Sequence, residues 1–364
     1  MPLNRNVFSR TLQRSKIEAG QADRQTAETA KRLQYAGKVI RQGGLVAFPT
    51  ETVYGLGGDA LNPQSAKKIY AAKGRPSDNP LIVHIAEMAA LDKIVENVPE
   101  YAKRLAAAFW PGPLTIILKK SDIVPKQTTG GLETVAVRMP NHPLALELIR
   151  EAGGYIAAPS ANLSGKPSPT AAKYVMQDML GRIDVIIAAD GTAIGLESTI
   201  VDLTGKVPII LRPGYITQEM IASVVGETNM DSTIFHNQSN KAPKAPGMKY
   251  RHYAPKGQLV IVEGTPDHVI NYINRQIQQH HQKGEKTGVI ATEKWAAHYN
   301  ADSIKNAGSK EEPQTAARKL YTFLREFDDE NIEYMYAESF GDTGLGQALM
   351  NRLLKAAGHK VVKV

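Results

Sequence analysis

The sequence contains no cysteine among its 364 residues, and this absence excludes two kinds of stabilising site. Neither disulfide bonds nor thiolate metal sites can form without cysteine, and a cytoplasmic location is therefore permitted and expected. No apolar run reaches the roughly 18 residues that a transmembrane helix needs, so we expect no contact with a membrane. Residues 1–25 also lack the apolar segment of a secretory signal.

Several catalytic signatures are missing as well. No G-x-x-x-x-G-K-S/T pattern occurs, so a bound nucleotide would need a geometry other than the P-loop. Neither paired carboxylates nor a Ser-His-Asp set stands out, which leaves arginine, lysine and hydroxyl groups as the available chemistry. Aromatic residues make up only 6% of the chain, and the aromatic-rich strands typical of RNA-binding domains are lacking.

The remaining composition is that of an ordinary globular protein with an excess of basic over acidic residues. Hydrophobic residues account for 42% and charged residues for 22%. A chain of 364 residues predicts two domains more readily than one. The formal net charge of +8 favours an anionic partner, which can be a nucleotide, a nucleic acid or both.

The stretch 45–85 organises the chain. Residues 45–48 are an apolar run that predicts a buried strand. Hydroxylated side chains and three glycines follow, and glycine permits close approach of the backbone to a ligand. Asn62 and Pro63 predict the N-cap and first turn of a helix, which we expect to end near Gly74.

A cluster of polar side chains follows this helix at every second position. Period two places Lys73, Arg75, Ser77 and Asn79 on one side of an extended segment, where they could cradle an oxyanion. Arginine offers a planar fork and lysine a point charge, a combination that suits a polyphosphate. The alternative is a solvated basic turn after a helix. The apolar strand that comes next is interrupted by His84.

Two further features point to an anionic ligand. Arg138 lies in the apolar strand predicted for residues 134–139, and a buried arginine needs an anionic partner unless it reaches solvent at the strand end. Residues 159–165 form a loop rich in serine and asparagine before a helix that Ser168 caps. Such a loop can bind phosphate or ribose, although these residues are also ordinary helix caps.

Alternation of strands and helices predicts an α/β protein with a twisted open sheet, followed by a smaller Rossmann-like α/β domain. Residues 1–25 read as an N-terminal extension and 26–226 as the first domain. Residues 227–257 are a polar linker without helical or strand periodicity, and 258–364 form the second domain.

The strings FPTETVYGLG at 48–57 and KGRPSDNPLIVHI at 73–85 resemble the YrdC-like family, the threonylcarbamoyl-adenylate synthases, in its two-domain version. The resemblance extends from about Thr26 to the end of the sequence. It includes the linker string KAPGMKYRHYAP, in which Ala245 stands where the family usually has serine. The fold that it implies is a YrdC-like sheet with a positively charged concave face.

The resemblance also implies a reaction. ATP, L-threonine and bicarbonate or CO₂ would give L-threonylcarbamoyl-adenylate and pyrophosphate, which is a nucleotidyltransferase activity. Mg²⁺ is expected on the ATP phosphates, but the sequence names no ligand for it. The product would supply a separate transferase system that modifies the tRNA adenosine next to the anticodon. The resemblance leaves open whether the chain touches tRNA itself.

Matching the family pattern residue by residue assigns two groups of site residues. Those that resemble the threonine pocket are Thr52, His84, Arg138, Ala158 and Ser198. Those that resemble ATP contacts are Lys73, Arg75, Ser77, Asn79, Thr134, Ser160, Ser168, Arg212, Tyr250 and Tyr253. Lys73 and Arg75 are the expected catalytic residues, and the two tyrosines resemble linker residues that fold over the nucleotide.

Two rival functions stay open at this point. One is a non-catalytic module that binds double-stranded RNA or tRNA, which the basic charge favours. The other is a different ATP-dependent carbamoyl-transfer enzyme with another amino-acid pocket. Nucleotide-dependent release of pyrophosphate distinguishes the first from a synthase, and dependence on threonine distinguishes the second.

Overall fold

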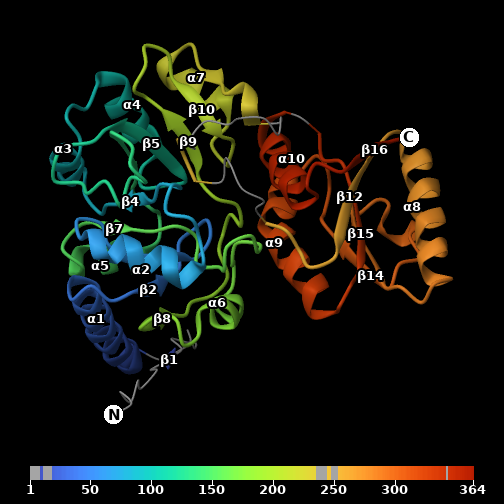
Figure 1. The fold of residues 1–364 in the computed structure, drawn as a ribbon, viewed down its shortest axis with the longest axis horizontal. Coiled ribbons are helices and arrows are strands. Elements are labelled where there is room, and N and C mark those ends of the chain that lie inside the picture. Colours follow the sequence, from blue (N-terminus) through green and yellow to red (C-terminus); the bar gives the residue numbers. More distant parts are fainter. Residues whose placement is uncertain (1–8, 11–18, 235–243, 247–252, 342) are drawn as a thin grey trace.

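The computed structural model describes residues 9–10, 19–234, 244–246, 253–341 and 343–364. Two α/β units lie side by side, each built on its own sheet (Figure 1). The predicted fold class, an open sheet followed by a smaller Rossmann-like domain, is confirmed. Within the described ranges, none of the helices combines the length and apolarity needed to cross a membrane.

The first unit contains an 11-stranded mixed sheet. Its strands are β1 (Ser9–Arg10), β2 (Val46–Phe48), β3 (Gly55–Asp59), β4 (Ile82–His84), β5 (Leu114–Lys119), β6 (Thr134–Arg138), β7 (Ile156–Ala157), β8 (Val185–Ile187), β9 (Thr199–Asp202), β10 (Ile209–Arg212) and β11 (Asn229–Met230). They lie in the order β1-β8-β2-β3-β7-β4-β6-β5-β9-β10-β11. Because β4 and β6 pair in parallel, His84 lies directly opposite Arg138.

Helices cover both faces of this sheet. They are α1 (Ala19–Arg41), α2 (Pro63–Lys73), α3 (Leu91–Ile94), α4 (Glu100–Phe109), α5 (Pro143–Glu151), α6 (Ala172–Met179) and α7 (Gln218–Val225). Helices α1 and α5 pack against Val46 and Phe48, whereas α2 and α4 share a core with Ala47. Alternate residues of β2 thus enter two separate cores, as the period of a strand requires.

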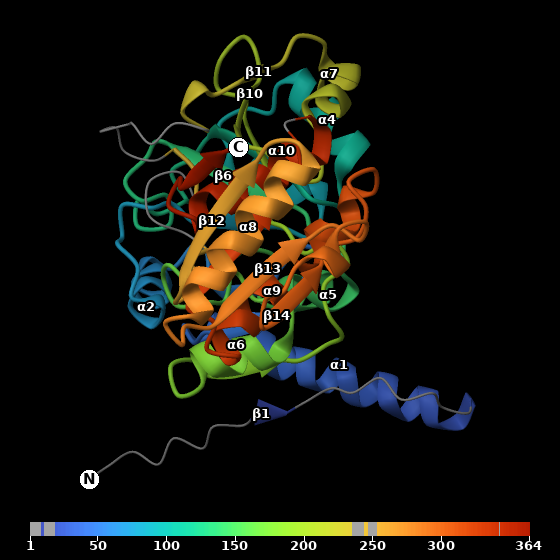
Figure 2. The ribbon, with the colours of Figure 1, turned by 90° about the vertical axis from the view of Figure 1, so that its right-hand side faces the viewer.

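The second unit has a smaller, all-parallel sheet. Its strands are β12 (Gln258–Glu263), β13 (Thr287–Ala291), β14 (Ser303–Asn306), β15 (Tyr334–Glu338) and β16 (Val361–Lys363), in the order β14-β13-β15-β12-β16. Its helices are α8 (Pro266–His281), α9 (Pro313–Asp329) and α10 (Gly344–Ala356). Helix α8 lies across the outer face (Figure 2), and α9 and α10 pack on the other face, next to the first unit.

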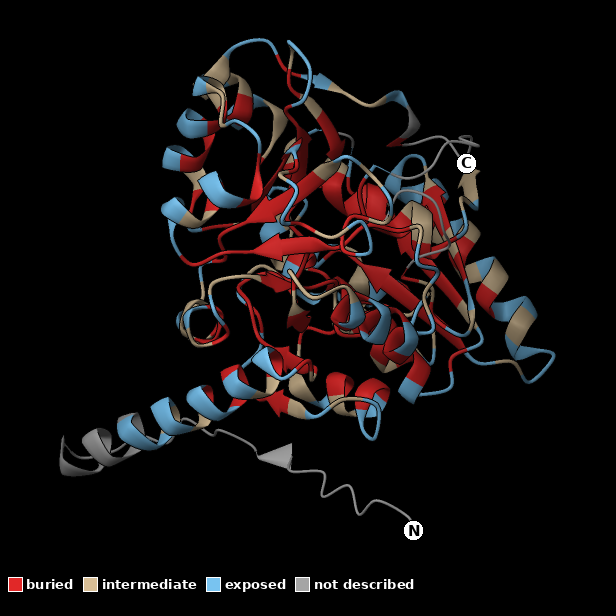
Figure 3. Cartoon of the chain, turned by 60° about the vertical axis from the view of Figure 1, so that its left-hand side comes forward, coloured by how far each residue is buried: buried red, intermediate tan, exposed pale blue. Residues whose placement is uncertain are grey.

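The two units share packed surface. Val53 and Leu196 of the first unit belong to the same apolar cluster as Leu320 and Leu324 of α9. Gly195 comes so near to α9 that an added Cβ would lie 2.4 Å from the Arg318 Cα. Figure 3 shows buried residues running through the strands of both units, with exposed residues on the outer helix faces. The two units therefore pack directly against each other.

The ends of α2 follow local sequence signals, but the segment after it does not. The Asn62 side chain accepts a hydrogen bond from the Gln64 backbone at 2.9 Å, and Gly74 ends the helix with φ of 61°. Because Lys73 is still helical and residues 77–79 form a turn followed by a bend, the predicted extended segment is wrong. Lys73 and Asn79 are buried, whereas Ser77 is exposed.

Some short strands of the structure were not predicted from the sequence. The glycines interpreted as ligand-approach positions lie in β3, where an added Cβ on Gly57 would sit 2.8 Å from Ile156 Cγ2. Their main effect is thus close packing within the sheet, although Gly55 does line the pocket described below. Strand β11 lies inside the segment predicted to have no strand and pairs with β10. Strand β14 was also missed.

Candidate active site

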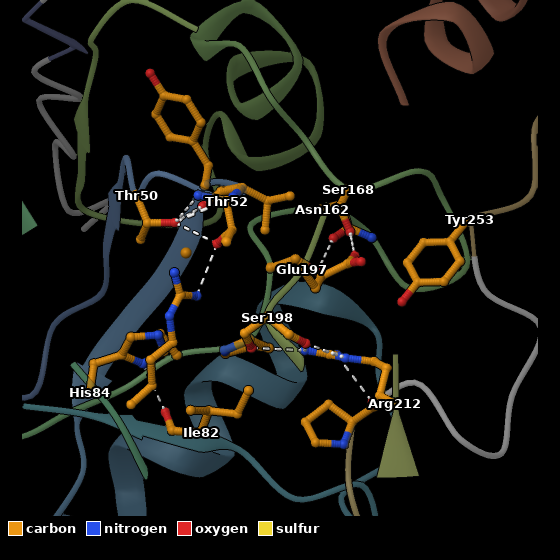
Figure 4. Close-up of a pocket in the computed structure, with 18 of the residues that line it drawn as sticks. Thr50, Thr52, Ile82, His84, Asn162, Ser168, Glu197, Ser198, Arg212 and Tyr253 are labelled. Atoms are coloured by element: carbon orange, nitrogen blue, oxygen red, sulfur yellow. Dashed lines mark hydrogen bonds between the residues drawn. The ribbon is translucent and has the colours of Figure 1, made fainter. Parts of the chain in front are cut away.

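A pocket opens where the ends of β4, β6 and β9 meet the loops after β2 and β7 (Figure 4). It offers about 630 Å³ of space free of protein atoms, part of which is open to solvent. The residues that line it are Thr50, Thr52, Val53, Tyr54, Gly55, Arg75, Ile82, His84, Arg138, Ala158, Pro159, Ser160, Asn162, Lys166, Ser168, Glu197, Ser198, Arg212, Pro246 and Tyr253. Two of its arginines, Arg138 and Arg212, define two regions.

One region, the Arg138 end, consists of Thr52, His84 and Arg138. Arg138 Nη1 donates to Thr52 Oγ1 at 2.9 Å, and its Nε donates to the carbonyl of Gly112 at 3.2 Å. Its Nη2 forms an ion pair with Glu51 Oε2 at 2.7 Å. Both partners of this pair are buried, so the guanidinium is held in one orientation. A buried, oriented arginine of this kind suits the recognition of a carboxylate.

His84 in this region is neutral at physiological pH. Burial, followed by the nearby charge of Arg138, lowers the pKa of His84 to about 3. Its Nδ1 donates to the carbonyl oxygen of Ile82 at 3.1 Å, which fixes the ring at the end of β4. His84 can therefore shape the pocket and hydrogen-bond a ligand without adding a charge.

The pKa of His84 predicts a contribution to acid unfolding. An unfolded histidine takes up a proton below about pH 6.5, whereas native His84 does not until about pH 3. Burial of neutral His84 therefore costs no stability above the unfolded pKa of about 6.5, and it lowers stability progressively as the pH falls from there toward about 3. We expect the free energy of unfolding, relative to a His84→Asn variant, to fall by about 1.4 kcal/mol per pH unit between about pH 6 and 4. Urea unfolding across this range measures it, and a pH-independent difference would contradict it.

The other region, the Arg212 end, consists of Ser168, Arg212 and Tyr253. Arg212 Nε and Nη2 donate to the carbonyl of Ser198 at 3.1 and 3.0 Å, and Nη1 donates to the carbonyl of Pro246 at 3.2 Å. Burial lowers the pKa of Arg212 from its usual value. Tyr253 is buried, and Figure 4 shows its ring beside Arg212 and Glu197.

Arg75 and Lys73 have different surroundings. Arg75 lines the pocket and its Nη2 donates to the carbonyls of Asn79 and Pro80 at 3.2 and 3.3 Å. Burial lowers its pKa to about 10, so it stays charged at neutral pH. Lys73 does not line the pocket, because its ammonium group donates to the carbonyls of Ser160 and Asn162 at 2.5 and 2.6 Å. Lys73 therefore holds the loop after β7.

The structure brings most of the predicted site residues together. Those that line the pocket are Thr52, Arg75, His84, Arg138, Ala158, Ser160, Ser168, Ser198, Arg212 and Tyr253. Those that do not line it are Lys73, Ser77, Asn79 and Thr134. Tyr250 lies outside the described residues.

Sequence reasoning missed two carboxylates. Glu51 pairs with Arg138, and Glu197 is a buried lining residue that accepts a hydrogen bond from Ser168 at the Arg212 end. Glu197 directly precedes Ser198 at the start of an apolar strand. A charged residue in or beside an apolar strand is the signal that identified Arg138 as a candidate. The same signal could have identified Glu197. The lining residue Lys166 was also missed, whereas Asn162 belongs to the loop 159–165 that was expected to bind phosphate or ribose.

The described residues contain no cluster of side chains suited to hold a metal ion. No group of three or more His, Cys, Asp or Glu side chains is arranged there to hold a metal ion. The carboxylate that lines the pocket, Glu197, already accepts hydrogen bonds from Ser168, Tyr321 and Arg352. The donor set does not fit a bound Mg²⁺, so we derive no step through a protein-held metal.

Comparisons with known proteins agree with this architecture. Residues 38–214 match the family described as Telomere recombination, and residues 216–358 match Threonylcarbamoyl-AMP synthase, C-terminal domain. A threonylcarbamoyl-AMP synthase of Bacillus subtilis is 51% identical over 329 residues, which cover 90% of this chain and 93% of that protein. The chain belongs to the two-domain, YrdC-like Sua5 family.

Pyrococcus abyssi provides both a sequence and a solved structure of the Sua5 family. Its threonylcarbamoyl-AMP synthase is 48% identical over 333 residues, covering 92% of this chain and 96% of that protein. The structure of P. abyssi Sua5 complexed with L-threonine matches with a TM-score of 0.89 at 45% identity, over 98% of this chain and 99% of that one. The whole two-domain Sua5 architecture is thus common to both chains.

Proposed function

We propose that this chain is an L-threonylcarbamoyl-adenylate synthase that uses ATP, L-threonine and bicarbonate or CO₂. The observation that carries the proposal is a single pocket with an oriented arginine at each end, Arg138 and Arg212. Such a pocket suits a carboxylate at one end and phosphates at the other. The names of the Sua5 relatives, and the L-threonine in the P. abyssi structure, support this choice of substrate and product.

The reaction balances without a protein nucleophile. The threonine amine and bicarbonate form a carbamate and water, and the carbamate oxygen then attacks the α-phosphorus of ATP. The bond from the α-phosphorus to the bridging oxygen breaks, and pyrophosphate leaves with the electron pair. Such a transfer depends mainly on alignment of the reactants and on stabilisation of charge. It is a nucleotidyltransferase reaction.

The Arg138 end would hold L-threonine. Arg138 would bind the α-carboxylate, while Thr52 and His84 would contact the remaining polar groups. Because Glu51 and Thr52 already orient Arg138, little rearrangement is needed when the substrate binds. Ser198 lies between the two ends, where its Oγ accepts from Arg212 Nη2 at 3.2 Å. Ala158 would contribute its backbone to the same end.

The Arg212 end and Arg75 would hold ATP. Arg75, Lys166 and Arg212 supply positive charge to the phosphates, and Ser160 and Ser168 supply hydroxyl groups. Tyr253 would cover the nucleotide from the side of the second unit. Mg²⁺ would enter as part of the Mg·ATP substrate. Lys73, first expected to touch phosphate, would instead position the loop that carries Ser160.

The product is a mixed anhydride that a separate transferase would consume. We propose that this transferase places the threonylcarbamoyl group on the tRNA adenosine next to the anticodon. We also propose a cytoplasmic location for the enzyme.

Release of pyrophosphate tests the proposal. With Mg·ATP, the full chain should release pyrophosphate only when L-threonine and bicarbonate are both present, because the carbamate is the nucleophile. A coupled pyrophosphate assay with each component omitted in turn measures this, and mass spectrometry identifies threonylcarbamoyl-adenylate. Equal release without threonine would contradict the proposal and would favour a different carbamoyl-transfer enzyme. No release under any condition would favour the RNA-binding alternative.

A further inference from the structure

Two buried carboxylates of the first unit connect the pocket to the second unit. Glu197 contacts the lining residue Ser168, and Asp178 contacts the lining residue Lys166. Each carboxylate also forms an ion pair with an arginine of the second unit, Arg352 with Glu197 and Arg325 with Asp178. Through these two ion pairs the second unit is connected to the Arg212 end.

The first connection runs from α9 and α10 through Glu197 to Ser168. Glu197 Oε2 accepts from Tyr321 Oη at 2.7 Å and from Arg352 Nε at 3.1 Å. Its other oxygen accepts from Ser168 Oγ at 2.6 Å. Arg352 Nη1 also donates to the carbonyl of Pro213 at 2.6 Å, directly after Arg212. One arginine of the second unit thus supports both Ser168 and the end of β10.

The second connection runs from α9 through Asp178 to Lys166. Arg325 Nη1 and Nη2 contact the two oxygens of Asp178 at 3.2 and 2.6 Å. The same carboxylate accepts from Lys166 Nζ at 2.8 Å. Arg325 also donates to the carbonyl of Pro167, which precedes Ser168. Both connections therefore converge on residues 166–168.

These charges are buried deeply enough to constrain geometry. Arg352 is 0% exposed and Arg325 is 3% exposed, while Glu197 and Asp178 are 7% and 2% exposed. An unpaired charge at such a site is strongly unfavourable, so each arginine and its carboxylate must keep their relative positions. Tyr321 is held further by Tyr253, whose ring stacks on it at 5.0 Å.

We propose that Tyr321, Arg325 and Arg352 are positioning residues through which the second unit sets the geometry of the Arg212 end for ATP. They act through Glu197 and Asp178 on Ser168 and Lys166. This inference rests on the proposed function for the identity of the nucleotide. At the Arg138 end the second unit contributes apolar and backbone contacts, through Val53 and Gly195, and none of these three side chains. Changes at these three side chains should therefore affect ATP more than L-threonine.

The test uses the full chain with Arg352→Lys and Tyr321→Phe. Arg352→Lys keeps the charge but loses the fork that joins Glu197 to Pro213. Tyr321→Phe removes one donor to Glu197 and keeps the ring that stacks on Tyr253. We expect the Kd for ATP, measured by calorimetry, to rise about tenfold in the first variant and about threefold in the second, because each variant loses hydrogen bonds that hold Glu197 or the end of β10. The Kd for L-threonine should stay within about twofold, because the changes lie away from the Arg138 end.

Thr322→Val is the matched control. It removes the hydrogen bond between Thr170 and Thr322, which also crosses between the units at 2.9 Å but reaches no lining residue. Its ATP affinity should not change.

Thermal unfolding shows that each variant is folded. Unchanged ATP affinity in folded Arg352→Lys and Tyr321→Phe would overturn the inference, as would equal losses of ATP and threonine affinity. If the unchanged chain bound no ATP, the proposed function would fail, and this inference with it.

Discussion

Replacing Arg138 with methionine should reduce threonine-dependent turnover by at least about a hundredfold, equivalent to a loss of about 3 kcal/mol in the transition state. Methionine keeps the aliphatic stem but has no charge, and it lacks both the hydrogen bonds that Arg138 donates to Thr52 and Gly112 and the ion pair with Glu51. The substrate carboxylate would then lose its proposed counter-ion. Steady-state release of pyrophosphate at saturating ATP, as threonine is varied, measures the effect.

The same substitution should destabilise the protein. Glu51 is only 7% exposed and would remain as a buried carboxylate without its partner. Breaking a buried ion pair in this way typically costs about 3–5 kcal/mol in the free energy of unfolding. Denaturant unfolding of Arg138→Met against the unchanged chain measures this cost.

A double variant separates the two effects. Arg138→Met with Glu51→Gln leaves no unpaired charge, so most of the lost stability should return. Its activity should stay low, because the proposed carboxylate partner is still absent. If the double variant regained near-normal turnover, Arg138 would be needed only to neutralise Glu51, and the threonine site would have to lie elsewhere.

Replacing Arg75 with alanine should also lower kcat by about a hundredfold or more. A preorganised donor to a developing anionic oxygen typically contributes about 3 kcal/mol in the transition state. The Nη2 of Arg75 is fixed by the carbonyls of Asn79 and Pro80, so its guanidinium is already oriented in the pocket wall. Arg75→Lys should lose activity as well, because the point charge of lysine does not replace the planar guanidinium and its several donors.

The control for Arg75 is Arg182→Ala. Arg182 is an exposed arginine that does not line the pocket, and its removal changes the net charge equally. Its kcat should be unchanged within about twofold. Near-normal kcat in folded Arg75→Ala would move the phosphate site elsewhere in the pocket.

The sequence by itself determined what depends on near neighbours along the chain. The caps of α2 at Asn62 and Gly74 could be predicted because a few adjacent residues decide where a helix starts and stops. The apolar strands around His84 and Arg138 could be predicted because hydrophobic runs signal burial. Ten of the twenty residues that line the pocket followed from the resemblance to the YrdC-like family.

The tertiary structure alone decided which side chains meet. Period two could not show that Lys73 belongs to α2 and turns into the protein, because the same spacing fits a strand, a helix end and a turn. Nor could it show that Glu197 meets Arg352, 155 positions further along the chain. That contact exists because the two sheets pack against each other through α9 and α10, and the local sequence does not show how two surfaces from distant parts of the chain fit together.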